Sequence, residues 1–382
     1  MILIKNVEVY SPASLGKKDV LVCGGKVEWI ANSIEFAEEA YCTAIDGTGK
    51  LLVPGLIDRH IHITGGGGEG GLHTRAPEVN LSALIQGGIT TVLGLLGTDG
   101  ITRSIENLLS KAKALYEEGI TAFICTGSYG YPSITLTDDV KKDIVFIPEI
   151  LGLKLALSDH RAPNITTEQL IRLASDTRVA GMVGKKPGFL VLHMGNDKLG
   201  LTPVFDALSS TSIPIKIFQP THCNRNPDLL KESFRFLEMG GYIDFTCDME
   251  GEPTPAECII AAKEKGIPTV GITCTSDGQG SWSNYDESGN LVKMGVSSVS
   301  SIFRQFQSMV RDYGFSIAEA ITYVSTNPAK ALEIYPQKGC IAQGCDADLL
   351  LLDENLELNT VIARGNILMK EYTLLKRGTY ED

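Results

Sequence analysis

The sequence predicts an α/β fold, a TIM (β/α)8 barrel with a small β-sandwich domain that both chain ends form. Three observations support this prediction. The chain has 382 residues, 43% of them are apolar, and the middle part alternates short apolar runs with amphipathic stretches. Such alternation is typical of βα units that build a parallel sheet. An open, doubly wound sheet is the alternative, and the number and spacing of the runs favour the barrel.

The two chain ends are rich in strand-like runs. Residues 1–55 contain MILIKNVEVY, DVLVCG, KVEWIA and KLLVPG, and Gly24-Gly25 separates two of these runs as a hairpin turn would. Residues 336–382 contain CDADLLLLD, NTVIARG and ILMKEYTLLKRG. We therefore expect residues 1–55 and 336–382 to form one small β-domain, next to a catalytic barrel that spans residues 56–335.

The barrel prediction depends on eight apolar runs in the middle of the chain. These runs are GLIDRHIHI, ITTVLGLLG, ITAFICTG, LGLKLALS, GFLVLHMG, IKIFQPTH, YIDFTCD and TVGITCTSD. Stretches with helical patterning lie between most of them, for example SIENLLSKAKALYEEG and PDLLKESFRFLEMG. Eight strands alternating with seven or eight helices match the plan of the (β/α)8 barrel.

Charge, hydropathy and cysteine usage narrow the class of protein. The formal net charge of −12 repels phosphate backbones, so we do not expect a nucleic-acid partner. No run reaches the roughly eighteen apolar residues that a membrane-spanning helix needs, and the N-terminal segment lacks the pattern of a signal peptide. The nine cysteines include no CxxC pair, which favours a reducing cytoplasm over a disulfide framework.

Four of the six histidines fall at the ends of predicted strands. His60 and His62 end the first run, His193 ends the fifth and His222 ends the sixth, while Asp277 ends the eighth. Active sites of such barrels lie at the carboxyl ends of the strands. His60 and His62 are two residues apart on a strand, so both face the same side. An HxH pair alone also fits core or surface histidines, but the added strand-end groups favour zinc, with manganese, iron, cobalt or nickel as alternatives.

Lys154 lies inside the apolar run LGLKLAL. A buried ammonium group is costly, so this side chain must reach solvent, form an ion pair or be chemically modified. A neutral lysine amine that captures CO2 becomes an anionic carbamate, whose two oxygens can bridge two metal ions. The histidines at neighbouring strand ends favour the carbamate over the ion pair.

A glycine-rich loop, GGGGEGG at residues 65–71, follows the first predicted strand. No Gly-Lys-Ser/Thr follows it, which excludes a phosphate-binding P-loop. Glycines allow the backbone to approach a small ligand closely. Glu69 at the tip of this loop is either a contact for a substrate ammonium group or a solvated glutamate on a turn.

Several of these segments resemble a known enzyme family. PGLIDRHIH resembles the first-strand motif of the amidohydrolase superfamily, and GCDADLLLLD resembles its return into a small β-domain. A closer resemblance, to the isoaspartyl (β-aspartyl) dipeptidases of that superfamily, covers nearly the whole chain. The segments that carry it, in order and spacing, are HITGGGGEGG, TRAPEV, GLLGTDGITR, TGSYGYPS, ALSDHR, GKKPG, HMG, PTHCNRN and TSDGQGS.

The resemblance implies a TIM barrel with two Zn²⁺ per chain. It implies six metal ligands, namely His60, His62 and Asp277 for the more buried ion, His193 and His222 for the other, and Lys154 as a bridging carbamate (N6-carboxylysine). A hydroxide also bridges the two ions in that family. Asp277 then has a second role, because it transfers the proton of the hydroxide to the leaving amine.

The resemblance also assigns substrate contacts. Tyr129 polarises the scissile carbonyl, although Tyr131 is close enough in sequence to be the matching residue instead. The implied substrate-binding residues are Glu69, Gly67, Thr98, Arg161, Arg225 and Ser281. Among these, Glu69 binds the free α-amino group of the substrate and the two arginines bind its carboxylates. His73 and His160 receive no role.

The predicted activity is hydrolysis of the β-aspartyl amide bond of a small dipeptide by a metal-bridging hydroxide. The alternatives are a hydrolase of cyclic amides or N-acyl amino acids, such as a dihydropyrimidinase or a deacetylase, and a non-catalytic scaffold on the same barrel. The presence of all six candidate ligands argues against the scaffold. Glu69, Arg161 and Arg225 favour the dipeptidase, because a substrate with charged termini needs such partners. The resemblance also implies a homo-oligomer, such as an octamer.

Overall fold

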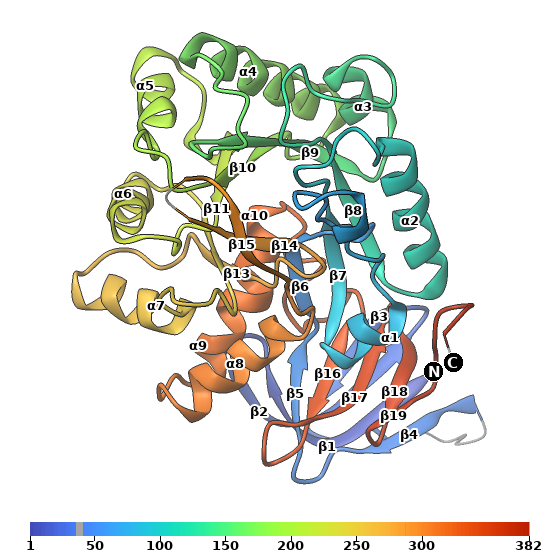
Figure 1. The fold of residues 1–382 in the computed structure, drawn as a ribbon. Helices are drawn as coiled ribbons and strands as arrows, with labels where there is room; N and C mark the ends of the chain where they lie inside the picture. The colour runs from blue at the N-terminus through green and yellow to red at the C-terminus, as the bar shows by residue number, and fades with distance from the viewer. Residues whose placement is uncertain (36–40, 287, 382) are drawn as a thin grey trace.

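The computed structural model describes residues 1–35, 41–286 and 288–381. Two sheets organise these residues (Figure 1). One is a nine-stranded sheet at one end of the molecule, and the other is a curved, parallel sheet with helices along its outer side. None of the described helices is long and apolar enough to cross a membrane.

Both chain ends contribute strands to the nine-stranded sheet, whose order is β19-β18-β17-β16-β5-β1-β2-β3, with β4 paired to β1. Its strands are β1 (Ile2–Tyr10), β2 (Ser14–Cys23), β3 (Lys26–Ala31), β4 (Thr43–Asp46), β5 (Leu51–Pro54), β16 (Leu349–Leu352), β17 (Leu358–Ala363), β18 (Asn366–Lys370) and β19 (Thr373–Leu374). The antiparallel ladder between β5 and β16 joins the two ends, with Leu349 opposite Pro54. The domain boundaries at residues 55 and 335 and the sandwich arrangement stay predictions.

The parallel sheet has the order β11-β10-β9-β8-β7-β6 and forms a curled half-barrel. Its strands are β6 (Leu56–Ile61), β7 (Ile89–Gly94), β8 (Thr121–Gly127), β9 (Ile150–Leu157), β10 (Phe189–Met194) and β11 (Phe218–Thr221). β12 (Ile243–Thr246) and β13 (Ile272–Thr275) form a separate parallel pair. Backbone hydrogen bonds link this pair to both edge strands, from Cys223 N to Asp244 O (3.0 Å) and from His62 N to Gly278 O (2.9 Å). The eight predicted strands are therefore all present, six in the parallel sheet and two in the separate pair.

Helices follow most strands of the parallel sheet. They are α1 (Leu81–Gln86), α2 (Ile105–Glu118), α3 (Val140–Phe146), α4 (Thr167–Gly184), α5 (Thr202–Ser210), α6 (Pro227–Glu238), α7 (Pro255–Glu264), α8 (Ser301–Arg311), α9 (Ile317–Ile321) and α10 (Asn327–Ala331), with the short turns η2 (Leu72–Thr74), η3 (Ile215–Ile217) and η4 (Thr322–Thr326). Local sequence sets where they begin. Thr166 and Thr254 form capping boxes at α4 and α7, which satisfy otherwise unpaired N–H groups.

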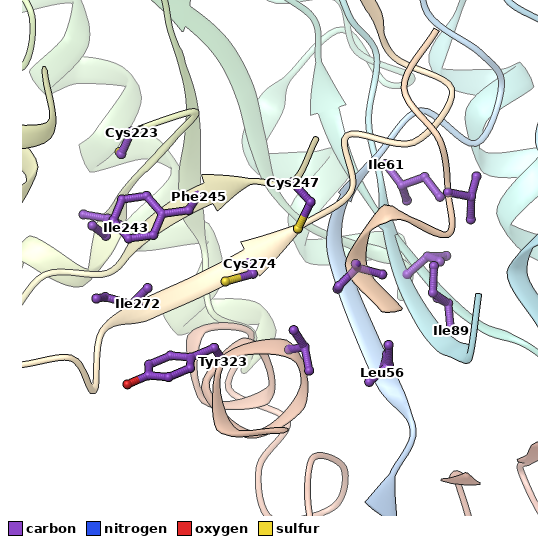
Figure 2. Packing of buried hydrophobic residues seen from close by; sticks show 14 of the residues in the cluster. Leu56, Ile61, Ile89, Cys223, Ile243, Phe245, Cys247, Ile272, Cys274 and Tyr323 are labelled. Carbon is purple, nitrogen blue, oxygen red and sulfur yellow. The ribbon is translucent and has the colours of Figure 1, made fainter. Parts of the chain in front are cut away.

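Apolar packing fixes the position of the strands. Figure 2 shows Ile243 and Phe245 of β12 next to Ile272 and Cys274 of β13, with Tyr323 of η4 close by. These five side chains are buried, and burial of each large apolar side chain contributes about 1.5–3 kcal/mol. Because side chains alternate along a strand, the residues between them face the other side of the sheet. The same alternation directs polar groups toward the interior, where the strands end.

A β-hairpin outside the parallel sheet is the main element that the sequence did not predict. It consists of β14 (Ser281–Tyr285) and β15 (Leu291–Val296), and it directly follows the loop after β13. Figure 1 shows it across the middle of the strands. The hairpin therefore brings Ser281 to the carboxyl ends of the parallel strands.

Candidate metal centre and active site

The structure brings the six predicted metal ligands together at the carboxyl ends of the strands. His60 lies on β6, Lys154 on β9 and His193 on β10. His62 and His222 come directly after the ends of β6 and β11, and Asp277 comes two residues after the end of β13. The histidine rings pack closely, with 4.9 Å between the ring centroids of His60 and His222 and 4.6 Å between those of His193 and His222.

His60, His62 and Asp277 form a compact cluster whose candidate ligand atoms all lie within 4.8 Å of one another. The Oδ1 atom of Asp277 is 3.2 Å from His62 Nε2 and 3.5 Å from His60 Nε2. This oxygen is buried, and no described residue hydrogen-bonds to it. A buried acceptor without a partner next to two imidazoles fits a divalent cation, which would satisfy the carboxylate.

The other two histidines each have a ring nitrogen held by a neighbouring polar side chain. His222 Nδ1 lies 2.6 Å from Thr246 Oγ1, and His193 Nε2 lies 3.0 Å from Asp159 Oδ2, where it donates to the carboxylate. Metal-binding histidines commonly engage their second ring nitrogen in this way, which fixes the tautomer and the ring orientation. Burial lowers the pKa of both histidines well below the usual value, so both rings are in the neutral form that binds metals.

Lys154 is completely buried. Burial lowers the pKa of its amine to about 7, although Asp277 acts in the opposite direction. Its Nζ atom lies 3.2 Å from His60 Nε2, and no carboxylate of a described residue is within ion-pair distance. The structure therefore rules out both the solvent-exposed and the ion-paired interpretation of Lys154. A neutral or chemically modified amine is what this position accommodates.

Glu69 connects the predicted substrate contacts into one group. Its carboxylate accepts hydrogen bonds from Ser281 Oγ (2.9 and 3.0 Å), Thr98 Oγ1 (3.1 Å) and Arg161 Nη1 (3.2 Å). Only 5% of its side chain is exposed, so a solvated glutamate on a turn is wrong as an interpretation. The carboxylate is instead the acceptor at the centre of a polar pocket wall.

Gly67 and Arg225 complete the predicted set. Gly67 has a φ of +83°, and a Cβ atom there would collide with the carbonyl oxygen of Thr74, so this loop conformation requires glycine. The Nε atom of Arg225 is buried and has no hydrogen-bond partner among the described residues. A buried donor of this kind needs an acceptor, and a ligand carboxylate would supply one.

A cavity of about 140 Å³ lies over these groups. The predicted site residues that line it are His62, Gly67, Glu69, Thr98, Tyr129, Arg161, His193, His222, Arg225, Asp277 and Ser281. The hairpin adds Trp282, Ser283 and Asn284. The histidines and Asp277 of the candidate metal centre therefore face the same cavity as the Glu69 carboxylate and the two arginines.

The structure distinguishes between the two candidate tyrosines. Tyr129 is buried, lines the cavity and places its hydroxyl 2.6 Å from His193 Nδ1. Tyr131 is 37% exposed and does not line the cavity. Burial raises the pKa of Tyr129, so its phenol is protonated and can donate a hydrogen bond. His73 and His160 lie outside the cavity lining, and 60% of the His160 side chain is exposed.

Sequence reasoning missed Asp159, which serves two predicted site residues at once. It accepts hydrogen bonds from Arg161 Nε and Nη2 (2.9 Å each) as well as from His193. Burial alone would raise the pKa of Asp159, but the hydrogen bonds from His193 and Arg161 outweigh it and hold the pKa well below the usual range. Its position directly after a strand end was the available signal.

Asp58 is a second missed carboxylate. It accepts hydrogen bonds from the backbone N–H groups of His60 and Ser276 (3.3 Å each) and from the Ser276 hydroxyl. These contacts tie β6 to the loop that carries Asp277. Complete burial raises the pKa of Asp58 to about 7.

Comparison with known proteins agrees with this geometry. Residues 256–368 match the amidohydrolase family. The chain is 42% identical to a β-aspartyl dipeptidase of Fervidobacterium islandicum AW-1, solved in complex with β-Asp-Leu dipeptide; both chains are covered completely, with a TM-score of 0.94. It is 23% identical to an L-hydantoinase of Paenarthrobacter aurescens over 93% of this chain and 86% of that protein.

More distant likeness shows the fold alone. A dihydropyrimidinase from Brevibacillus agri NCHU1002 has 18% identity and a TM-score of 0.68, over 98% of this chain and 96% of that one. The 42% identity with the β-aspartyl dipeptidase, over the full length of both chains, is far higher than these values. The chain therefore belongs to the β-aspartyl dipeptidase family of the amidohydrolases.

Proposed function

We propose that this protein is a dinuclear-zinc hydrolase that cleaves the β-aspartyl (isoaspartyl) amide bond of dipeptides. The observation that carries the proposal is the shared cavity, in which a buried glutamate and two arginines face three histidines and an aspartate. His60 and Lys154 do not line the cavity, but His60 packs against His222 and lies 3.2 Å from the Lys154 amine. A substrate with one ammonium group and two carboxylates matches that set of charges. The likeness to a dipeptidase that binds β-Asp-Leu supports the same substrate class.

The residues present fit two zinc ions. His60, His62 and Asp277 would hold one ion, His193 and His222 would hold the other, and the carbamate of Lys154 would bridge them. The Asp277 oxygen without a hydrogen-bond partner and the neutral histidines support this assignment. When bound, such ions lower the pKa of a water molecule toward neutrality and polarise the scissile carbonyl. The pKa of Lys154, about 7, provides the neutral amine that a carbamate requires.

Tyr129 and Asp277 are the residues that we assign to the chemistry. Tyr129 keeps its proton because burial raises its pKa, so its hydroxyl would donate to the oxyanion that develops on the carbonyl oxygen. Asp277 would accept a proton from the attacking water and deliver it to the nitrogen of the leaving amine. Both groups line the cavity, Tyr129 from the loop after β8 and Asp277 from the loop after β13.

Substrate recognition would depend on the Glu69 group. Glu69 would bind the α-ammonium group, with Ser281 and Thr98 holding the carboxylate in place. Arg161 and Arg225 would bind the substrate carboxylates, and Gly67 would contact the aspartyl portion through its backbone. Hydrogen bonds to charged groups contribute about 1.5–3 kcal/mol each, so these contacts would fix both the position and the type of amide.

The second candidate is a hydrolase of cyclic amides or of N-acyl amino acids. The likeness to L-hydantoinase and dihydropyrimidinase favours it at the level of the fold. A neutral ring would leave the buried Nε atom of Arg225 without an acceptor, which is costly. The charges of the cavity therefore favour the dipeptide.

The deciding experiment compares three substrates: β-Asp-Leu, α-Asp-Leu and dihydrouracil. We expect hydrolysis of β-Asp-Leu and little turnover of the other two, because only the β-linked dipeptide places an ammonium group and a carboxylate at the spacing of Glu69 and the arginines. Preference for α-Asp-Leu or dihydrouracil would refute the dipeptidase assignment.

The proposal extends to the closure of the barrel and to the oligomeric state. We propose that the eight strands close into a complete TIM barrel, which the backbone hydrogen bonds between the two ladders support. We also propose a homo-oligomer, with the octamer as the specific expectation. Light scattering coupled to size-exclusion chromatography measures the mass of the assembly, and a monomeric mass would contradict this expectation.

A further inference from the structure

Two cysteines far from the metal centre lie in one tight loop. Cys340 and Cys345 are in the connection between α10 and β16 and are both buried, each with 5% exposure. The loop turns back on itself through a hydrogen bond from Cys345 N to Ala342 O (3.1 Å), and Gly344 adopts the φ of +89° that the turn requires. The turn brings the two thiols to the same place.

The two sulfur atoms are in direct contact. Their Sγ atoms lie 3.3 Å apart, and both thiols approach the carbonyl oxygen of Pro336, at 3.1 Å for Cys340 and 3.0 Å for Cys345. A carbonyl oxygen has two lone pairs and can accept from both thiols, and the two sulfur atoms also lie within hydrogen-bond distance of each other. Among the described residues, no other pair of cysteines makes a sulfur–sulfur hydrogen bond.

The contact makes the two thiols chemically different. The hydrogen bond from Cys340 lowers the pKa of Cys345 below that of an ordinary thiol, and Lys26 acts in the same direction. The pKa of Cys340 is raised, mainly through the same hydrogen bond. By contrast, burial raises the pKa of Cys125 and Cys223 to about 12. A thiolate next to a thiol is the arrangement that thiol–disulfide exchange uses.

We propose that Cys340 and Cys345 form a thiol–disulfide exchange site, which closes to an intrachain disulfide when it meets a small disulfide such as oxidised glutathione. Because Cys345 is buried, the loop must first open enough to expose its sulfur. The Cys345 thiolate then attacks one glutathione sulfur, the glutathione S–S bond breaks, and one glutathione thiolate leaves. Cys340 then transfers its proton to solvent, attacks Cys345 Sγ and releases the second glutathione. Two protein thiols are oxidised and one glutathione disulfide is reduced to two thiols.

The site lies in the connection that leads from the last helix beside the half-barrel, α10, to strand β16 of the nine-stranded sheet. Cys345 O accepts a hydrogen bond from Val27 N (2.9 Å), and Gly344 N donates to Val27 O (2.8 Å), so the loop is attached to the start of β3. Neither cysteine lines the metal-centre cavity. We therefore expect oxidation to leave peptide hydrolysis unchanged and to raise the temperature of thermal unfolding, because the cross-link restricts the unfolded chain.

The test treats the full-length protein with oxidised glutathione at neutral pH. We expect the number of thiols titrated in denaturant to fall from nine to seven and the intact mass to decrease by two hydrogen atoms. No Lys or Arg lies between Lys338 and Arg364, so trypsin leaves both cysteines in one peptide. That peptide should lose two hydrogens without gaining a partner peptide, and dithiothreitol should restore nine thiols.

Matched variants separate this pair from the other cysteines. Cys345→Ser should abolish the loss of thiols, whereas Cys258→Ser, which removes a buried thiol of α7, should leave it intact. Nine thiols after treatment, a persistent glutathione adduct or a disulfide in another peptide would each overturn the proposal. If Cys345→Ser fails to fold, the peptide map of the unaltered protein still decides.

Discussion

Replacing Lys154 by alanine is the sharpest test of the two-metal centre. The side chain is completely buried, and no described carboxylate pairs with it. Alanine removes the amine that would carry the carbamate and leaves the histidines of the neighbouring strands in place. We expect kcat/KM for β-Asp-Leu to fall about 10³-fold, which corresponds to about 4 kcal/mol of transition-state stabilisation.

Burial also sets the fraction of the Lys154 amine that is neutral. An amine with the ordinary pKa of 10.5 is neutral in roughly one molecule in 3,000 at pH 7, whereas an amine with a pKa of about 7 is neutral in roughly half. Burial therefore increases the neutral fraction by about 10³. Only the neutral amine captures CO2, so the site prepares Lys154 for the modification.

The assay measures β-Asp-Leu hydrolysis with and without short carboxylic acids such as acetate or propionate. Such an acid can occupy the space that alanine leaves, and partial recovery of activity is the expected result. Lys186→Ala is the matched control, because burial also lowers the pKa of Lys186, yet its amine binds the carbonyl oxygen of Ile150 (3.1 Å). Activity of Lys154→Ala within about tenfold of the unaltered protein would refute the bridging role.

Stability of the metal-free protein gives a second readout of Lys154. Because the folded-state pKa is lower than the unfolded-state pKa, the unfolded chain holds the extra proton between about pH 7 and 10.5. Stability should therefore rise with pH across this window, by at most about 5 kcal/mol. Lys154→Met should abolish that dependence and be more stable at pH 7. Identical pH profiles in urea unfolding would contradict the lowered pKa.

Four further predictions concern the other site residues. Tyr129→Phe should lower kcat by about 10²–10³ while Tyr131→Phe leaves it unchanged, and the reverse result in steady-state assays would exchange their roles. Glu69→Gln should raise KM about 10–100-fold with zinc content unchanged; an unaltered KM would remove Glu69 from amine recognition. Asp159→Asn should weaken zinc binding about 10–100-fold in competition with a chelator; an unchanged affinity would show that His193 does not need this carboxylate. Removal of metal by a chelator should abolish activity, and two equivalents of Zn²⁺ should restore it; full activity without metal would end the proposal.

The strand-end histidines could be predicted from sequence because their pattern is local. An apolar run followed by a polar residue marks the point where a buried strand meets the active-site end, and His193 shows this pattern directly. His60 and His222 lie at the ends of runs that already contain other polar residues. The parallel order of β6 to β11 was equally accessible, since each run is followed by a helical pattern. The strand-like runs at both chain ends predicted that the ends meet in one β-domain, but not that β5 pairs with β16, two strands far apart in sequence.

Side-chain contacts between segments far apart in the sequence could not be predicted from the sequence in this way. Thr246, which holds His222, is an ordinary strand residue until the two strands are placed side by side. Lys154 could be recognised as costly, but only its surroundings show that no carboxylate is near. The Cys340 and Cys345 pair escapes motif reading because a spacing of five residues has no fixed meaning, and a turn is needed to bring the sulfurs together.

One oxygen atom of Asp159 is shared between a candidate metal ligand and a substrate-binding arginine. Oδ2 lies 3.0 Å from His193 Nε2 and accepts a hydrogen bond from Arg161 Nη2 at 2.9 Å. If His193 binds zinc as proposed, a shift of its imidazole on loss of the ion would move the anchor of the guanidinium. Metal affinity and affinity for the substrate carboxylate become linked equilibria, and whatever free energy the substrate gains from zinc, zinc gains from the substrate.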